Sequence, residues 1–214
     1  MQKAKNIVII SPFFFPEPIS TGKFNTDVAL KLQEEGHQVT VLCSHPFYPD
    51  WKTRYSSEKL EGITIIRGGN KIKYPNKISL RRIVLEIWYA LFILKNIKKH
   101  QNKIDVIIPV FPPSLAFYTA SFFIKKEIKK IGIIHDLQII YSLQKKGFLG
   151  NLISFFIRKV EKFCFKNCDK LIFLSDEMKN EAIKIYKIKK EKCEVQYPFI
   201  TIKDLPISNN LKNI

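Results

Sequence analysis

The sequence predicts an α/β protein with a doubly wound parallel sheet of the Rossmann-like type. Short continuous runs of β-branched and other apolar residues recur along the chain, which is typical of strands covered on both faces. Segments with the apolar spacing of helices alternate with these runs. This alternation places the strands parallel to one another and the helices on both faces of the sheet.

The strand candidates begin with "NIVII" and end with "CEVQYP". We predict strands over 6–10, 37–43, 62–68, 104–110, 131–135, 169–175 and 193–198. Pro109 is expected to break the fourth strand, because proline has no N–H to donate to a sheet.

The helix candidates lie between these strands. In the first, Phe24, Val28 and Leu32 are four residues apart, and Gly36 suits the position after a helix end. The prolines of "SPFFFPEP" exclude regular structure just before it. We predict helices over 24–35, 79–100, 114–129, 149–166 and 176–187.

Composition narrows the class of protein. The chain has 214 residues, is 46% hydrophobic and carries a formal charge of +17, which favours a folded core and anionic partners. We expect no nucleic-acid partner, because the basic residues are interleaved with long apolar runs and no nucleic-acid motif is present. The four cysteines show no metal-ligand spacing, so we expect reduced thiols and no metal. We also expect no cofactor. The first residues lack the features of a signal peptide.

The stretch "IIHDLQ" ends an apolar run on His135 and Asp136. Ligands of doubly wound sheets bind beyond the carboxyl ends of the strands, and this pair is predicted at such an end. A carboxylate there could orient a hydroxyl group or act as a general base, with His135 as a second catalytic candidate. Alternatively, His135 is structural and Asp136 forms a turn.

Other strand ends carry further binding candidates. Gly22 and Lys23 open a helix, where backbone amides and a lysine attract phosphate, although Gly22 could merely relieve a tight turn. "SHPFYPDW" offers His45, Tyr48 and Trp51 for stacking on a ligand, or as a cover for the end of the sheet. Ser175 is a candidate for substrate binding, but its position favours a helix N-cap.

Segment 79–100 combines apolar and basic residues. From Lys71 to Lys103 there are nine Lys or Arg and one Glu, a net charge of +8. The apolar run is shorter than the roughly 20 residues that span a bilayer. An amphipathic helix in the headgroup layer is one interpretation, and a core helix with a basic end is the other. The membrane interpretation uses Arg81, Arg82, Trp88, Lys95, Lys98 and Lys99.

Several motifs, in this order, resemble bacterial family 4 glycosyltransferases with the GT-B fold, of the colanic-acid or exopolysaccharide type. The resemblance starts with "SPFFFPEPISTGKFNTDVALKLQEEGHQVTVLCSHPFYPDW". It continues through "PVFPPSLAF", "IIHDLQ" and "EKFCFKNCDKLIFLSDEMKNE", and so covers nearly the whole chain. The family usually has a second glycine in the first loop, and this chain keeps only Gly22.

The resemblance implies a Rossmann-like N-terminal domain over 1–200 and a linker over 201–214 toward a C-terminal donor-binding domain that this sequence does not contain. In that family the N-terminal half holds the acceptor, typically a lipid-linked glycan at the inner face of the cell membrane, and the other half holds the nucleotide-sugar donor. The expected partners are therefore this acceptor, the donor through the other half and an anionic membrane surface. The implied activity is sugar transfer in capsule, exopolysaccharide or lipopolysaccharide synthesis.

The resemblance also assigns roles. It places Gly22 and Lys23 near phosphate, Tyr48 and Trp51 on the acceptor side, and Asp136 near the reacting hydroxyl. A non-catalytic membrane-docking or scaffold module on the same fold is the alternative. Either would be cytoplasmic and peripheral to the membrane.

Overall fold

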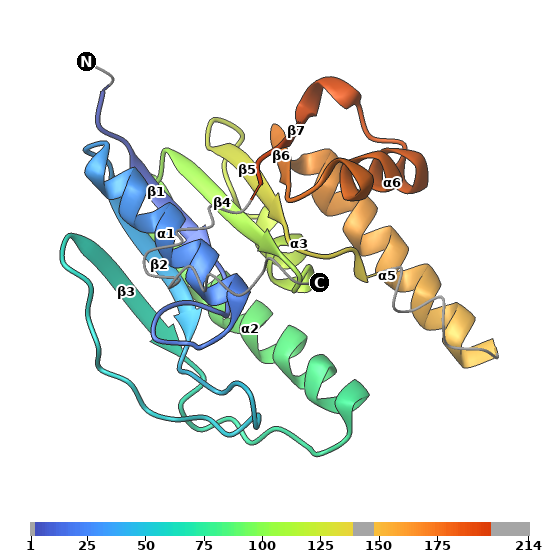
Figure 1. Ribbon diagram of the computed structural model, residues 1–214, viewed down its shortest axis with the longest axis horizontal. Helices are drawn as coiled ribbons and strands as arrows, with labels where there is room; N and C mark the ends of the chain where they lie inside the picture. The colour runs from blue at the N-terminus through green and yellow to red at the C-terminus, as the bar shows by residue number, and fades with distance from the viewer. Residues whose placement is uncertain (1–2, 139–147, 198–214) are drawn as a thin grey trace, which may run out of the picture.

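The computed structural model describes residues 3–138 and 148–197 and contains a seven-stranded parallel sheet (Figure 1). The order is β3-β2-β1-β4-β5-β6-β7. The strands are β1 (Asn6–Ile10), β2 (Gln38–Ser44), β3 (Ile63–Gly68), β4 (Val106–Phe111), β5 (Lys129–Ile134), β6 (Lys170–Phe173) and β7 (Cys193–Val195). The predicted α/β fold with a doubly wound parallel sheet is confirmed.

Helices cover both faces of the sheet. Because side chains alternate along a strand, Ile7 and Ile9 of β1 pack with α1, while Val8 and Ile10 pack with the opposite helices. The first face carries α1 (Ser20–Glu34). The second face carries α2 (Ile78–His100), α3 (Leu115–Ser121), α5 (Phe148–Asn167) and α6 (Asp176–Tyr186).

The strand order reverses direction between β1 and β4, which are paired in parallel. In this class of sheet the crevice outside the carboxyl ends of such strands is the usual ligand site. The loops after β1, β2, β4 and β5 all reach this edge, which we call the rim. The N-terminal ends of α2 and α5 extend beyond the strands on the same side (Figure 1).

Two predicted elements differ from the structure. The helix predicted over 114–129 ends at Ser121, and Ile124 and Ile128 are buried in the connection to β5. Their four-residue spacing mimicked a continuing helix. Strand β4 is not broken at Pro109, which pairs with Ile10 of β1. The N–H that Pro109 lacks is missing on the edge of β4 that faces β5. There the residue pairs between the two strands stop at Ile107 and resume at Val110.

Smaller differences concern element ends. Helix α1 starts at Ser20, four residues earlier than predicted, and β7 ends at Val195. The predicted linker over 201–214 lies outside the described residues. Among the helices of the described ranges, none is long and apolar enough to cross a membrane.

Candidate functional site

A buried carboxylate joins two loops at the rim. Glu17, in the loop after β1, is only 5% exposed, and its oxygens accept hydrogen bonds from the backbone N–H groups of Phe47 and Tyr48 in the loop after β2. Burial raises the pKa of Glu17, whereas these N–H groups and the charges of Arg54 and Arg67 oppose that shift. The loop that carries Tyr48 is therefore fixed by Glu17.

Gly22 lies against the same loop. A Cβ atom at Gly22 would be 3.0 Å from the backbone oxygen of Glu17 and 3.3 Å from its Cβ. The glycine thus allows the first turn of α1 to pack on the Glu17 loop. Lys23, the next residue, is exposed. The structure brings Gly22 and Tyr48 to one junction, centred on Glu17.

Arg67, at the end of β3, adds a positive charge behind this junction. Its guanidinium donates to the backbone oxygen of Phe15 at 2.6 Å and to that of Ser44 at 3.3 Å. The same charge contributes, after burial, to a lowered pKa of His45. Arg67 therefore ties the loops after β1 and β2 to the third strand.

His135 is held by α1. Its Nε2 lies 3.3 Å from Asn25 Oδ1, and its ring packs edge-on against Phe24 at 5.1 Å. Because an amide oxygen only accepts, Nε2 carries the proton and Nδ1 keeps its lone pair. Burial lowers the pKa of His135 to about 4, so the ring is neutral near pH 7.

Asn25 fixes this arrangement. It is 1% exposed, and its amide nitrogen donates to Ser11 Oγ at 2.9 Å and to the backbone oxygen of Phe13 at 3.3 Å. These bonds turn its Oδ1 toward His135. Asp136 follows at the rim and is exposed. The structure thus places His135 inside the rim and Asp136 at its surface.

His45 lines a cavity at the β3 side of the rim. Its ring stacks on Tyr55 at 5.0 Å, and its Nδ1 accepts a hydrogen bond from the backbone N–H of Ser56. The cavity has a volume of about 510 Å³ and is lined also by Arg67 and by segment 55–60.

Trp51 belongs to an aromatic cluster. Its backbone is in the left-handed region, with φ of 58°, and its ring packs against Phe47 and Tyr74 at 5.1 Å each. The guanidinium of Arg81 lies 4.5 Å from the ring centroid. Arg81, a predicted membrane contact, therefore contacts a predicted substrate residue.

Trp88 turns toward the same cluster. Its Nε1 donates to the hydroxyl of Tyr74 at 2.9 Å, and its ring packs closely over Gly69. This packing leaves Trp88 partly buried, while Arg82, Lys95, Lys98 and Lys99 are exposed. Ser175 is the N-cap of α6, where its Oγ accepts from the N–H of Met178.

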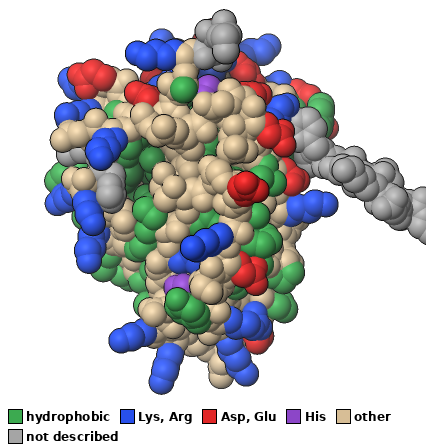
Figure 2. Space-filling model, turned by 90° about the vertical axis from the view of Figure 1, so that its left-hand side faces the viewer, with side chains coloured by type: hydrophobic (Ala, Val, Ile, Leu, Met, Phe, Trp, Pro, Cys, Tyr) green, Lys and Arg blue, Asp and Glu red, His purple; other side chains and the backbone are tan. Residues whose placement is uncertain are grey.

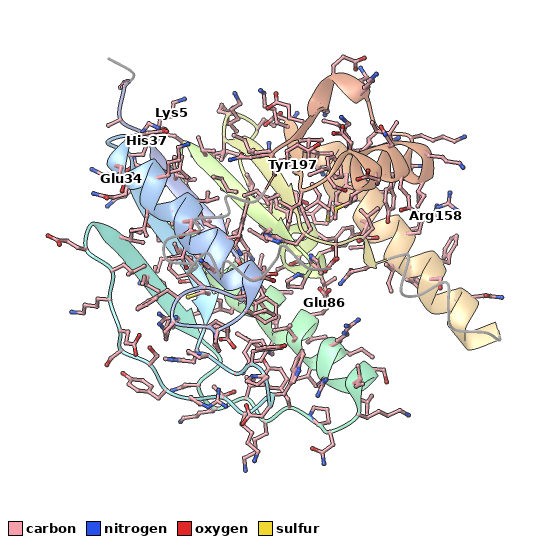
Figure 3. The ribbon with its side chains drawn as sticks, in the orientation of Figure 1. Lys5, Glu34, His37, Glu86, Arg158 and Tyr197 are labelled. Carbon is pink, nitrogen blue, oxygen red and sulfur yellow. The ribbon has the colours of Figure 1, made fainter. Side chains whose placement is uncertain are left out.

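A partly buried polar chain lies behind Asp136 and was not predicted from the sequence. Glu86 of α2 accepts from Gln138 Nε2 at 2.8 Å and from the N–H groups of Ser114 and Leu115. Glu161 of α5, which is 0% exposed, accepts from the N–H of Gln138 at 2.9 Å. Burial raises the pKa of Glu86. Figure 3 shows Glu86 near the carboxyl ends of the central strands.

A larger hollow lies at the other end of the sheet. It has a volume of about 550 Å³ and is lined by parts of β1, β2 and β3, by Asn96 and Ile97 of α2, and by His37. Figure 2 shows hydrophobic side chains in this hollow, and Figure 3 places His37 near Lys5 and Glu34, far from Glu86. Within the described residues, no three His, Cys, Asp or Glu side chains gather in a way that could hold a metal ion.

Solved structures of glycosyltransferases share this fold. Sucrose-phosphate synthase from Thermosynechococcus elongatus superposes with a TM-score of 0.62 at 13% identity, over 90% of this chain and 48% of that one. Starch synthase IV from Arabidopsis thaliana, bound to ADP and acarbose, superposes with a TM-score of 0.59 at 10% identity, over 92% of this chain and 52% of that one. UGT89C1 from the same plant, complexed with UDP, superposes with a TM-score of 0.55 at 13% identity, over 94% of this chain and 53% of that one. The chain thus spans about half the length of each structure.

The fold is the Rossmann-like α/β fold of the N-terminal half of GT-B glycosyltransferases. The family model for Glycosyltransferase Family 4 matches residues 21–204, and the chain belongs to this family. No curated protein sequence matches it. Membership of family 4 and the Rossmann-like fold are confirmed, whereas the bacterial colanic-acid or exopolysaccharide type stays a prediction.

Proposed function

We propose that the chain is the acceptor-binding half of a glycosyltransferase that transfers sugar from a nucleotide-sugar donor to a lipid-linked glycan. The observation that carries the proposal is the junction at Glu17, which fixes the loops after β1 and β2 beside the first turn of α1. A bound acceptor would meet Tyr48 and Trp51 from one loop and Asp136 from another. The pathway would be capsule, exopolysaccharide or lipopolysaccharide synthesis, as in the colanic-acid type.

The chemistry of the rim supports separate roles for Asp136 and His135, which are adjacent and titratable. Asp136 is exposed and could orient or deprotonate an acceptor hydroxyl. His135 is neutral and, with a pKa of about 4, is a weak base. We assign His135 to positioning the Asp136 turn against α1. Gly22 and Lys23 would lie near the diphosphate of the acceptor, and His45 beside its sugar.

The donor would bind to the other half of the enzyme. ADP and UDP are present in two of the similar structures, each about twice as long as this chain. A lipid-linked acceptor would place the protein at the cytoplasmic face of the membrane. The basic charge of +17 suits both the diphosphate and that surface.

Binding of a short-chain polyprenyl-diphosphate sugar, measured by fluorescence or calorimetry, tests the proposal. Asp136→Asn and Tyr48→Ala should each weaken this binding at least fivefold, while Glu35→Gln, an exposed acid at the other end of the sheet, should not. The chain alone should not turn over nucleotide sugar. Turnover at ordinary enzyme rates, or an acceptor affinity unchanged in both rim variants, would refute the proposal.

A further inference from the structure

We propose that the outward faces of α2 and α5 together form a docking surface for an anionic membrane. Both helices cover the same face of the sheet, and their N-terminal ends extend beyond the strands (Figure 1). The proposal rests on the proposed function in one respect, because a lipid-linked acceptor would lie at such a membrane. It names the surface that would hold the protein there.

Large apolar side chains are exposed along both helices. On α2, Ile83, Ile87 and Leu91 are between 50% and 64% exposed and are spaced four residues apart. On α5, Leu152, Phe155 and Phe156 are between 43% and 59% exposed and have the i, i+3, i+4 spacing of one helix face. Contiguous exposed apolar groups of this size mark a binding surface for a protein or a membrane.

The charges of the two helices favour a membrane. Each helix contains a single acidic residue, Glu86 in α2 and Glu161 in α5, and each one points inward to Gln138. The basic residues of the two helices are Arg81, Arg82, Lys95, Lys98, Lys99, Arg158, Lys159, Lys162 and Lys166. Basic residues beside an apolar stripe are the pattern of helices that lie in the headgroup layer of anionic bilayers.

The turn after α3 connects the two helices. Lys98 of α2 lies 3.9 Å from the ring centroid of Phe123, and Phe122 stacks on Phe163 of α5 at 5.4 Å. Phe122 and Phe123 are themselves 62% and 43% exposed. Since Gln138 binds both Glu86 and Glu161, the helices are held together on their inner side as well. The exposed apolar residues therefore belong to one layer of helices on this face of the sheet.

This surface differs from the one predicted from the sequence. Trp88, a predicted membrane contact, packs inward on Gly69 and Tyr74, and Arg81 covers Trp51. Their places are taken by aromatic residues that the sequence analysis did not select, Phe122, Phe123, Phe155 and Phe156. The apolar part of the surface thus comes from α2, from α5 and from the turn after α3.

Co-sedimentation with vesicles tests the surface. The chain should bind vesicles containing 30% phosphatidylglycerol and should bind pure phosphatidylcholine vesicles at least tenfold more weakly. Lys95→Gln with Lys159→Gln removes one charge from each helix and should weaken binding about tenfold or more. Lys3→Gln with Lys5→Gln, two exposed lysines at the other end of the sheet, removes the same charge and should have little effect.

A second pair of variants tests the apolar component. Leu91→Ser with Phe156→Ser should also weaken vesicle binding at least tenfold, whereas Tyr55→Ser, which alters a side chain that is 75% exposed elsewhere, should not. Unchanged binding in both helix pairs would overturn the proposal. So would self-association through these residues without vesicle binding, because the face would then belong to a second copy. The vesicles contain no acceptor, so this result is independent of the acceptor-binding test.

Discussion

Glu86 of α2 and Glu161 of α5 bind the same residue, Gln138, through its side chain at 2.8 Å and its backbone N–H at 2.9 Å. Gln138 lies two residues after Asp136. The turn that presents the candidate catalytic carboxylate is therefore held from behind by two carboxylates on different helices, Glu86 partly buried and Glu161 fully buried. This relationship connects the core of the protein with its rim.

Replacing Glu86 should destabilise the fold. Glu86→Ala leaves the N–H groups of Ser114 and Leu115 and the amide of Gln138 without their acceptor, and each unpaired buried group costs about 1–3 kcal/mol. We expect a loss of about 3 kcal/mol in the free energy of unfolding, measured with urea. Glu86→Gln keeps one acceptor oxygen and should lose about 1 kcal/mol. Equal stability of the alanine variant and the wild type would contradict the role of Glu86.

The same residue should make stability depend on pH. Because burial raises the pKa of Glu86 above 4.5, its contribution is fully present below that pH and is lost as the pH rises through the folded-state pKa. The difference in unfolding free energy between wild type and Glu86→Gln should therefore shift against the wild type as the pH rises. Urea titrations at several pH values measure it. A difference that does not change with pH would show that folding does not raise the pKa of Glu86.

The sequence was sufficient for the sheet and its rim but not for the polar chain of Glu86, Gln138 and Glu161. Continuous apolar runs identified the strands, and the position of His135 and Asp136 at the end of one run identified the rim. In the sequence, Glu86 could be recognised only as a charged residue that interrupts an apolar helix. Its partner Gln138 is 52 residues away, and local spacing carries no information about a contact at that distance.

The bond between Asn25 and His135 was hidden for the same reason. Its partners are separated by 110 residues. Asn25 directly follows the Gly22-Lys23-Phe24 motif, but it is not itself part of that motif. The error in α3 has a different origin. Ile124 and Ile128 have helical spacing, but they belong to a connection to β5 that lies at the surface, with only these two side chains buried in the core.

His135 should reduce stability at acid pH. Its pKa is about 6.5 in the unfolded chain and about 4 when folded, so the unfolded state binds a proton first as the pH falls. The wild type should lose up to about 3 kcal/mol relative to His135→Gln between these two pH values. Urea unfolding of both proteins from pH 7 to pH 4 measures the difference. Parallel stability curves for the two proteins would refute the assignment.

Asn25 offers a way to shift that pKa. Asn25→Asp places a carboxylate where the amide oxygen now lies, 3.3 Å from Nε2, and should raise the pKa of His135 by more than one unit. NMR titration of the ring protons measures the pKa of His135 directly. Asn25→Ala is the control, because it removes the contact without adding charge. If His135 titrates alike in the aspartate and alanine variants, the contact does not control its pKa.

Gly69 and Gly36 form a matched pair that tests the packing of Trp88. Both glycines have positive φ, 81° and 87°, so alanine at either should cost about 1–2 kcal/mol for the left-handed backbone. A Cβ at Gly36 meets nothing within 4 Å, whereas one at Gly69 would lie 2.7 Å from the Trp88 ring. Gly69→Ala should therefore cost at least about 1 kcal/mol more than Gly36→Ala in urea unfolding.

Combining Gly69→Ala with Trp88→Leu provides the control. The smaller side chain removes the clash, so the alanine at Gly69 should cost less in the Trp88→Leu background than in the wild type, as measured by a double-mutant cycle. Equal costs at Gly69 and Gly36, with no coupling to Trp88, would mean that the indole ring does not pack on this turn. Trp88 would then be available to a membrane after all, as the sequence had suggested.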